Sequence, residues 1–306
     1  MRRRWVRAVI GVAGSALALA LVAAAAYRSY GPGDAAARLA NLQQRWRPFY
    51  DPIGETTAPQ IWRFIGGGVL LTLEAAVIAV LLSLLLGIGL ALLRLSRNRQ
   101  VGIPAGPAAR AAVATPASVV VQSIRSLPLF LLILYTFIAA PKLGLQLPAM
   151  AAGIVALTVY TSCVLAEIVR AGILSLDRGQ FEAADALGLR YLQKLRYVVL
   201  PQALRRMVPA VVSQLVTLIK DTSLLSNITV TELMRRMIIL SQAYFNPIEC
   251  YLVAGSIYFV INLSLSSLAR RLEVRPTAKA AAGVPTVQGV GSEDQTLIAT
   301  AAPTSR

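Results

Sequence analysis

Apolar residues gather into long runs along this chain, and short polar segments rich in arginine separate the runs. A helix of about 20 residues crosses a bilayer core about 30 Å thick, and six of the runs reach that length. The pattern predicts an all-α integral membrane protein with about six transmembrane helices. The predicted spans are residues 6–26, 64–93, 117–140, 147–169, 207–225 and 250–268.

Composition supports a bilayer and argues against enzyme chemistry. Hydrophobic residues make up 56% of the 306 residues, and charged residues only 14%. No histidine occurs, so the commonest general base and the histidine ligands of zinc and haem are missing. Both cysteines, Cys163 and Cys250, lie in apolar runs without metal-ligand spacing. We therefore expect no catalytic residues, no cofactor and no metal site.

Charge carries information about partners and topology. The chain has 30 Lys and Arg against 14 Asp and Glu, and its arginines flank the apolar runs, as anionic headgroups and the positive-inside rule favour. We therefore expect a lipid bilayer and no nucleic acid as partner. The start MRRRWVR and an even number of spans predict cytoplasmic N- and C-termini. Two observations leave the first span open: residues 27–63, predicted outside, carry five arginines, and the first run also resembles a cleavable signal peptide.

The segment QFEAADALGLRYLQKLRYVVLPQALRR, residues 180–206, lies between the fourth and fifth predicted spans and is amphipathic and basic. We expect Gly179 to end the preceding helix, a short helix to begin near Phe181, and Gly188 to supply a left-handed C-cap. Leu200-Pro201 then begins the next helix, with proline at an early position.

The short helix is expected to place Phe181 and Ala184 on one face, with Leu187 or Gly188 following. So short an element is not stable alone, and we interpret it as a helix that docks into the groove of a partner. The segment after it places four apolar residues at helical spacing on one face: Leu189, Leu192, Leu195 and Val199.

The same residues resemble a known family. Glu182-Ala183-Ala184, followed by three residues, Gly188 and later Leu200-Pro201, is similar to the EAA loop of type-1 ATP-binding-cassette importer permeases. Four further blocks resemble the polar amino acid uptake branch of that family. They are SIRSLPLFLLI (123–133), AEIVRAGILSLDRGQFEAADALG (166–188), LPQALRRMVPA (200–210) and LIKDTSLLSNI (218–228).

The resemblance implies a permease domain at residues 62–274 in a bacterial inner membrane. The first apolar run predicts an N-terminal transmembrane anchor and extracytoplasmic loop at 1–61, an addition to the family's usual short N-terminus, and composition predicts a disordered tail at 275–306. The implied partners are a dimer of ABC ATPase subunits, an extracytoplasmic substrate-binding protein that delivers a polar amino acid, and a second permease in a homo- or heterodimer. A cytoplasmic coupling helix between spans four and five would contact the ATPase. The implied coupling residues are Glu182, Ala183, Ala184, Leu187, Gly188, Leu200 and Pro201.

Polar residues within the predicted spans mark a candidate substrate path, because such residues are costly in a membrane. Thr217, Lys220 and Asp221 share one face of the fifth span, and Tyr160 and Glu167 share one face of the fourth. A structural interpretation is also open. Lys220 would then pair with a carboxylate such as Glu74, and Glu167 would anchor only its neighbour Arg170, at i, i+3.

No Walker A loop occurs, because none of the four lysines follows a glycine. The predicted function is therefore the permease subunit of an importer whose ATP hydrolysis is performed by a separate subunit. The alternative is an ion-coupled secondary transporter or channel, in which Glu74, Glu167, Lys220 and Asp221 would be ion sites.

Overall fold

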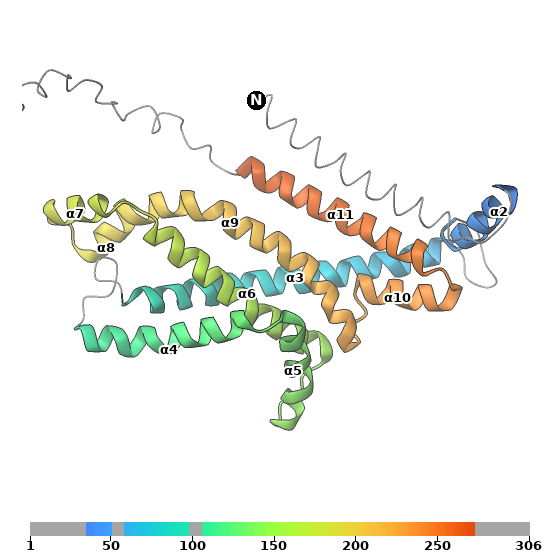
Figure 1. Ribbon diagram of the computed structural model, residues 1–306, viewed down its shortest axis with the longest axis horizontal. Coiled ribbons are helices and arrows are strands. Elements are labelled where there is room, and N and C mark those ends of the chain that lie inside the picture. The colour runs from blue at the N-terminus through green and yellow to red at the C-terminus, as the bar shows by residue number, and fades with distance from the viewer. Residues whose placement is uncertain (1–34, 51–57, 98–105, 273–306) are drawn as a thin grey trace, which may run out of the picture. The chain divides into compact units, whose positions relative to one another are not determined.

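The computed structural model describes residues 35–50, 58–97 and 106–272, and every regular element in these ranges is a helix (Figure 1). The all-α membrane fold expected from the apolar runs is confirmed. The elements are α2 (Ala35–Trp46), the 3₁₀ helix η1 (Arg47–Phe49), α3 (Ala58–Leu95), α4 (Pro107–Ser126), α5 (Leu129–Lys142), α6 (Ala149–Leu174), α7 (Arg178–Ala186), α8 (Tyr191–Lys194), the π-helical turn η2 (Leu195–Val199), α9 (Leu200–Asp221), the 3₁₀ helix η3 (Thr222–Ile228), α10 (Leu233–Tyr244) and α11 (Pro247–Leu272).

Four stretches of the described chain are long and apolar enough to cross a membrane: α3, α6, the stretch from α8 to η3, and α11. The bent pair α4–α5 makes a fifth if it is counted as one span. The predicted first span, 6–26, and the predicted tail, 275–306, lie outside the described residues. The count of six spans and the cytoplasmic placement of the termini therefore stay predictions.

The predicted span 117–140 is wrong as a single helix. α4 ends at Ser126 and α5 begins at Leu129, with a bend of 104° between them. Leu127 adopts φ −88° and ψ 140°, because the ring of Pro128 disfavours helical backbone in the residue before it. Proline also has no N–H to continue the helix, so the break follows from the local sequence.

α3 packs mainly on α6, and small residues allow the two helices to approach closely. Ala75, Ala79 and Ala156 at this contact are at most 1% exposed. A Cβ on Gly87 of α3 would lie 2.9 Å from the Cβ of Leu165 on α6. Close packing of this kind stabilises helix pairs in lipid, where burial of apolar surface between helices supplies no driving force.

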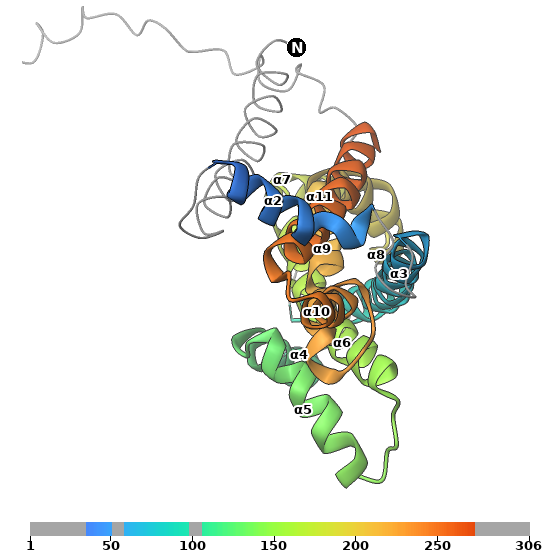
Figure 2. The same cartoon turned by 90° about the vertical axis from the view of Figure 1, so that its right-hand side faces the viewer.

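Helix α10, which packs on α3 and α11 (Figure 2), was not expected from the sequence. It begins after Glu232, whose carboxylate accepts hydrogen bonds from the backbone N–H groups of Met234 and Arg235 at 2.9 and 2.8 Å. The same carboxylate accepts from the hydroxyls of Thr72 on α3 and Tyr258 on α11, at 3.2 and 3.0 Å. Burial raises the pKa of this carboxyl, and the hydrogen bonds oppose that shift. Glu232 therefore ties three helices together.

Candidate coupling and translocation site

Helix α7 is the short helix predicted after the fourth span, and it begins earlier than expected. The Asp177 carboxylate caps it by accepting a hydrogen bond from the Gly179 N–H at 2.7 Å, so the helix starts at Arg178 rather than near Phe181. α6 has already ended at Leu174, and the expectation that Gly179 ends it is wrong. Aspartate is a strong N-cap, and this signal in the sequence was overlooked.

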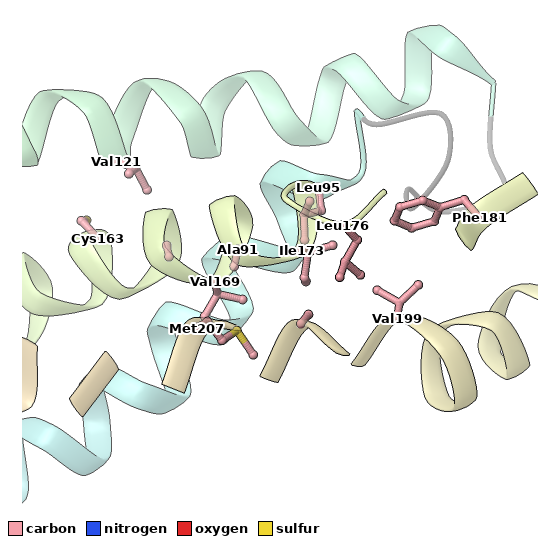
Figure 3. Packing of buried hydrophobic residues seen from close by; sticks show 12 residues of the cluster. Ala91, Leu95, Val121, Cys163, Val169, Ile173, Leu176, Phe181, Val199 and Met207 are labelled. Carbon is pink, nitrogen blue, oxygen red and sulfur yellow. The ribbon is translucent and has the colours of Figure 1, made fainter. Parts of the chain in front are cut away.

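One face of α7 is anchored in the end of the helical bundle. Phe181 and Ala184 are each 2% exposed, and Phe181 packs in an apolar cluster with Leu176 and Val199 (Figure 3). Gly188 has a φ of 69°, in the left-handed region that glycine adopts without strain. The expected C-cap is thus confirmed.

Polar contacts tie α7 to the chain that leads into α9. The Lys194 ammonium donates to the Asp185 carboxylate at 2.7 Å, and the side-chain amide of Gln202 donates to that of Gln180 at 2.9 Å. The π-helical turn Leu195–Val199 lies between these two contacts. A displacement of α7 would therefore reach the start of α9 through direct contacts on both sides of that turn.

Three large apolar side chains here point away from the bundle: Leu187 is 79% exposed, Leu192 72% and Tyr197 66%. The prediction that Leu192 shares one helical face with Val199 is wrong, because Val199 is 1% exposed. The π-helical turn Leu195–Val199 has i→i+5 hydrogen bonds in place of i→i+4 bonds, so the spacing of an α-helix does not continue from Leu192 to Val199.

The other predicted coupling residues lie around this surface. Glu182 and Ala183 are exposed on α7, and Glu182 forms an ion pair with Arg178 at 2.8 Å. α9 begins at Leu200 with Pro201 in its first turn, as expected.

Glu167 on α6 is surrounded by arginines. Its carboxylate lies 2.5 Å from the guanidinium groups of Arg94 and Arg170, and Arg125 is 3.8 Å away. The pair with Arg170 is the one that the i, i+3 spacing predicted, and it is confirmed. Arg94 belongs to α3 and Arg125 to α4, and neither contact was predicted. One carboxylate thus joins three helices, with three guanidinium groups around it.

The polar stripe of α9, made of Thr217, Lys220 and Asp221, is only partly covered by the other helices of the described chain. Lys220 is exposed, and Thr217 and Asp221 are half-buried, as is Tyr160 on α6. Among the residues that the structure describes, no hydrogen bond or ion pair joins the stripe to Tyr160, and none joins Lys220 to Glu74. A shared substrate path stays a prediction.

Long apolar helices, ion pairs between them and a short braced helix at one end describe an integral membrane protein. The family model described as "Binding-protein-dependent transport system inner membrane component" matches residues 83–277, and the chain belongs to this family. It is therefore a multi-pass permease of the inner membrane, a transport subunit rather than an enzyme. The family works together with an ATPase and a binding protein.

Named relatives are similar over most of their length. The chain is 43% identical to the probable glutamine ABC transporter permease protein GlnP of Bacillus subtilis (strain 168), over 70% of this chain and 94% of the relative. It is 34% identical to the arginine transport system permease protein ArtQ of the same organism, over 71% of this chain and 94% of the relative. A solved structure titled "Crystal structure of an amino acid ABC transporter with histidines" matches with a TM-score of 0.63 and 30% identity, over 70% of this chain and 94% of that one.

Proposed function

We propose that this permease imports a polar amino acid, delivered by an extracytoplasmic binding protein, and that α7 receives the force of a cytoplasmic ATPase dimer. The names of the relatives, which include glutamine and arginine transport proteins, support the substrate class. The proposal rests mainly on how α7 is held in the structure and on what it leaves exposed. Its inner face is anchored by Phe181, it is braced through Asp185 and Lys194, and Leu187 is left exposed at its end.

The coupling surface consists of the exposed side chains of Leu187, Leu192 and Tyr197. Exposed apolar groups gathered in one segment mark an interaction site, and a short amphipathic helix fits a groove of the partner. When ATP binding brings two ATPase subunits together, α7 moves with them, and the contact of Asp185 with Lys194 passes the movement to α9. The permease then alternates between two states according to the contacts that each state makes.

The half-covered polar stripe of α9 supports a second permease as partner. Exposing Lys220 to lipid is costly, and a second copy or a homologous chain would cover this face and enclose a hydrophilic path. Thr217 and Asp221 line that path in the proposal, with Tyr160 beside them. Glu167 lies nearer the coupling end, where its surrounding arginines leave positive charge that suits a substrate carboxylate.

The orientation follows from the same proposal. α7 lies in the cytoplasm, so the arginine cluster around Glu167 is near the inner leaflet, as the positive-inside rule favours. In this orientation both termini lie in the cytoplasm. The proposal keeps the division of the chain into an N-terminal anchor and loop (1–61), a permease domain (62–274) and a tail (275–306).

The test compares two leucines of nearly equal exposure, Leu187 at 79% and Leu143 at 76%. Leu187→Glu is expected to abolish co-purification of the partner ATPase subunit, and to abolish uptake of the amino acid. Leu143→Glu, at the end of α5, is expected to keep the ATPase bound. If Leu187→Glu retains the ATPase and wild-type uptake, α7 is not the coupling element.

A second measurement separates ATP-driven import from ion-coupled transport. Uptake in proteoliposomes with ATP supplied inside is expected to continue after an ionophore collapses the proton gradient. Uptake that stops with the gradient, while ATP is held constant, contradicts the proposal.

A further inference from the structure

The segment α2–η1 precedes the region that matches the family, 83–277, and side-chain contacts hold it at one end of the helical bundle. The indole N–H of Trp62 on α3 donates to the Phe49 carbonyl at 2.9 Å, and the side-chain amide of Asn246, before α11, donates to the Arg45 carbonyl at 3.0 Å. The ring of Trp46 lies 5.7 Å from that of Phe49. The position of α2 is therefore fixed relative to α3 and α11.

α2 lies across the bundle rather than along it. In Figure 2, α3 and α10 are seen nearly along their axes, whereas α2 runs across the view. α3 is one of the helices that are long and apolar enough to cross a membrane, so a helix that crosses its direction runs roughly parallel to the membrane plane. Helices that lie in a membrane interface have this orientation.

α2 is amphipathic. Leu39, Leu42 and Trp46 follow one another at spacings of three and four residues, which places them on one face of the helix. Leu39 is 51% exposed, and Leu42 and Trp46 are half-buried. Successive residues of an α-helix are about 100° apart around its axis, so Asn41 lies on the side opposite to Leu39. We call the face formed by Leu39, Leu42 and Trp46 the apolar face of α2.

The polar side of α2 faces the rest of the chain. A pocket opens between α2 and the turn from α10 to α11, and it is lined by Asn41, Gln44, Arg45, Tyr244 and Phe245. A surface helix that packs only on its own protein turns its apolar side inward. α2 does so at its end, where Trp46 packs on the apolar cluster of Phe49 and Ile61. Its apolar face then continues to Leu39, which is left exposed.

The surroundings of the apolar face are those of a lipid interface. Tyr50 and Trp62 are 61% and 45% exposed, and tyrosine and tryptophan are enriched where a bilayer meets water. Further along α3 the exposed side chains are aliphatic, among them Leu70 at 69% and Leu85 at 72%. In a helix that crosses a membrane, such side chains suit contact with acyl chains. The aromatic rings and α2 therefore lie at the edge of a lipid-facing surface.

We propose that α2 is an interfacial helix, with its apolar face inserted between the lipid headgroups and the beginning of the acyl chains. Burial of apolar surface supplies the attraction, so a zwitterionic lipid is sufficient. The hydrogen bond from Trp62 to the Phe49 carbonyl then links the depth of α2 in the leaflet to that of the beginning of α3.

α2 belongs to the leaflet at the end of the bundle away from α7 (Figure 1). α3 begins beside η1 and ends at Leu95, which packs in the same apolar cluster as Phe181 of α7. Only the name of this leaflet rests on the proposed function. With α7 in the cytoplasm, it is the outer leaflet.

The experiment places a nitroxide spin label at single positions of α2 in the full chain, reconstituted in phosphatidylcholine proteoliposomes. Cys163→Ala and Cys250→Ser remove the two native thiols, which are buried. Power saturation then compares the collisions of the label with oxygen, which concentrates in lipid, and with a water-soluble nickel chelate. The ratio of oxygen to nickel collisions is expected to be several-fold higher at Leu39→Cys than at Asn41→Cys, the matched control on the opposite side of the helix.

A label scan over residues 39–46 extends the comparison. Maxima of the ratio are expected at positions 39, 42 and 46, with the period of an α-helix. The comparison of Leu39→Cys with Asn41→Cys decides the matter even where a label at Trp46 disturbs folding, because both side chains are exposed.

Two results would overturn the inference. A ratio at position 39 no higher than that at position 41 means that the apolar face lies in water. Few collisions with either reagent at position 39 mean that protein covers it, either a second chain or another segment of this one. The measurement needs neither the ATPase nor a substrate, so a failure of the proposed function would leave its result unchanged.

Discussion

The contact of α3 with α10 predicts opposite effects for two glycines only two residues apart. A Cβ on Gly68 would lie 2.8 Å from the Cδ of Arg236 and 3.0 Å from the Cα of Leu233, whereas a Cβ on Gly66 would meet nothing within 4 Å. Alanine in place of glycine within a helix gains up to about 1 kcal/mol. Overpacking against a neighbour costs about 1–3 kcal/mol, and the backbone of Leu233 cannot rotate away as a side chain can.

Because the gain in helix propensity is common to both variants, it cancels in their comparison. Gly66→Ala is expected to be neutral or stabilising, and Gly68→Ala to be less stable than Gly66→Ala by about 1–3 kcal/mol. Thermal unfolding of the purified variants in one detergent, followed by tryptophan fluorescence, measures the difference. A shift of roughly 2–4 °C per kcal/mol is typical for a domain of 150–250 residues. Equal unfolding temperatures would show that α10 does not pack on α3 at Gly68.

Three further expectations concern other parts of the fold. Gly188→Ala forces alanine into the left-handed conformation at a cost of about 1–2 kcal/mol, and uptake is expected to fall while the protein still inserts into membranes. Glu167→Gln weakens the bonds to Arg94 and Arg170, with an expected loss of about 1.5–3 kcal/mol of unfolding free energy in denaturant titration. Because burial raises the pKa of Glu232, stability is expected to be highest below the unfolded pKa of about 4.3 and to fall as pH rises through the folded pKa. Glu232→Gln should remove this slope in unfolding curves measured from pH 4 to pH 8.

Much of the helical order could be predicted, because crossing a bilayer demands long apolar runs. The cores of α3, α6, α9 and α11 lie within predicted spans. α10 was missed because its 12 residues are too few for a span and include two arginines. The break after Ser126 was also missed. The sequence contains Leu127-Pro128, but a span predicted from its apolar residues alone does not detect a helix break caused by proline.

The candidate site was predictable where its contacts are local. The spacing of Glu167 and Arg170 is a property of one helix, and the pair forms as predicted. The contact of Arg94 with Glu167 crosses 73 residues, and no periodicity in a single sequence encodes it. The same limit applies to the glycines. A side chain on Gly66 or Gly89 would meet nothing within 4 Å, whereas one on Gly68 would contact Leu233, and the sequence does not distinguish these positions.

The two carboxylate clusters indicate which helices move least. Thr72 on α3 donates to Glu232, and Arg94, 22 positions further along the same helix, pairs with Glu167. Separating α3 from α10 would remove a hydrogen bond from the buried carboxylate of Glu232, and separating α3 from α6 would remove an ion pair from the partly buried carboxylate of Glu167, so both separations are costly. The α4–α5 junction has an extended residue at Leu127 instead of continuous helix. We therefore expect rearrangement between transport states to concentrate at that junction, with α3 and α6 moving as one body.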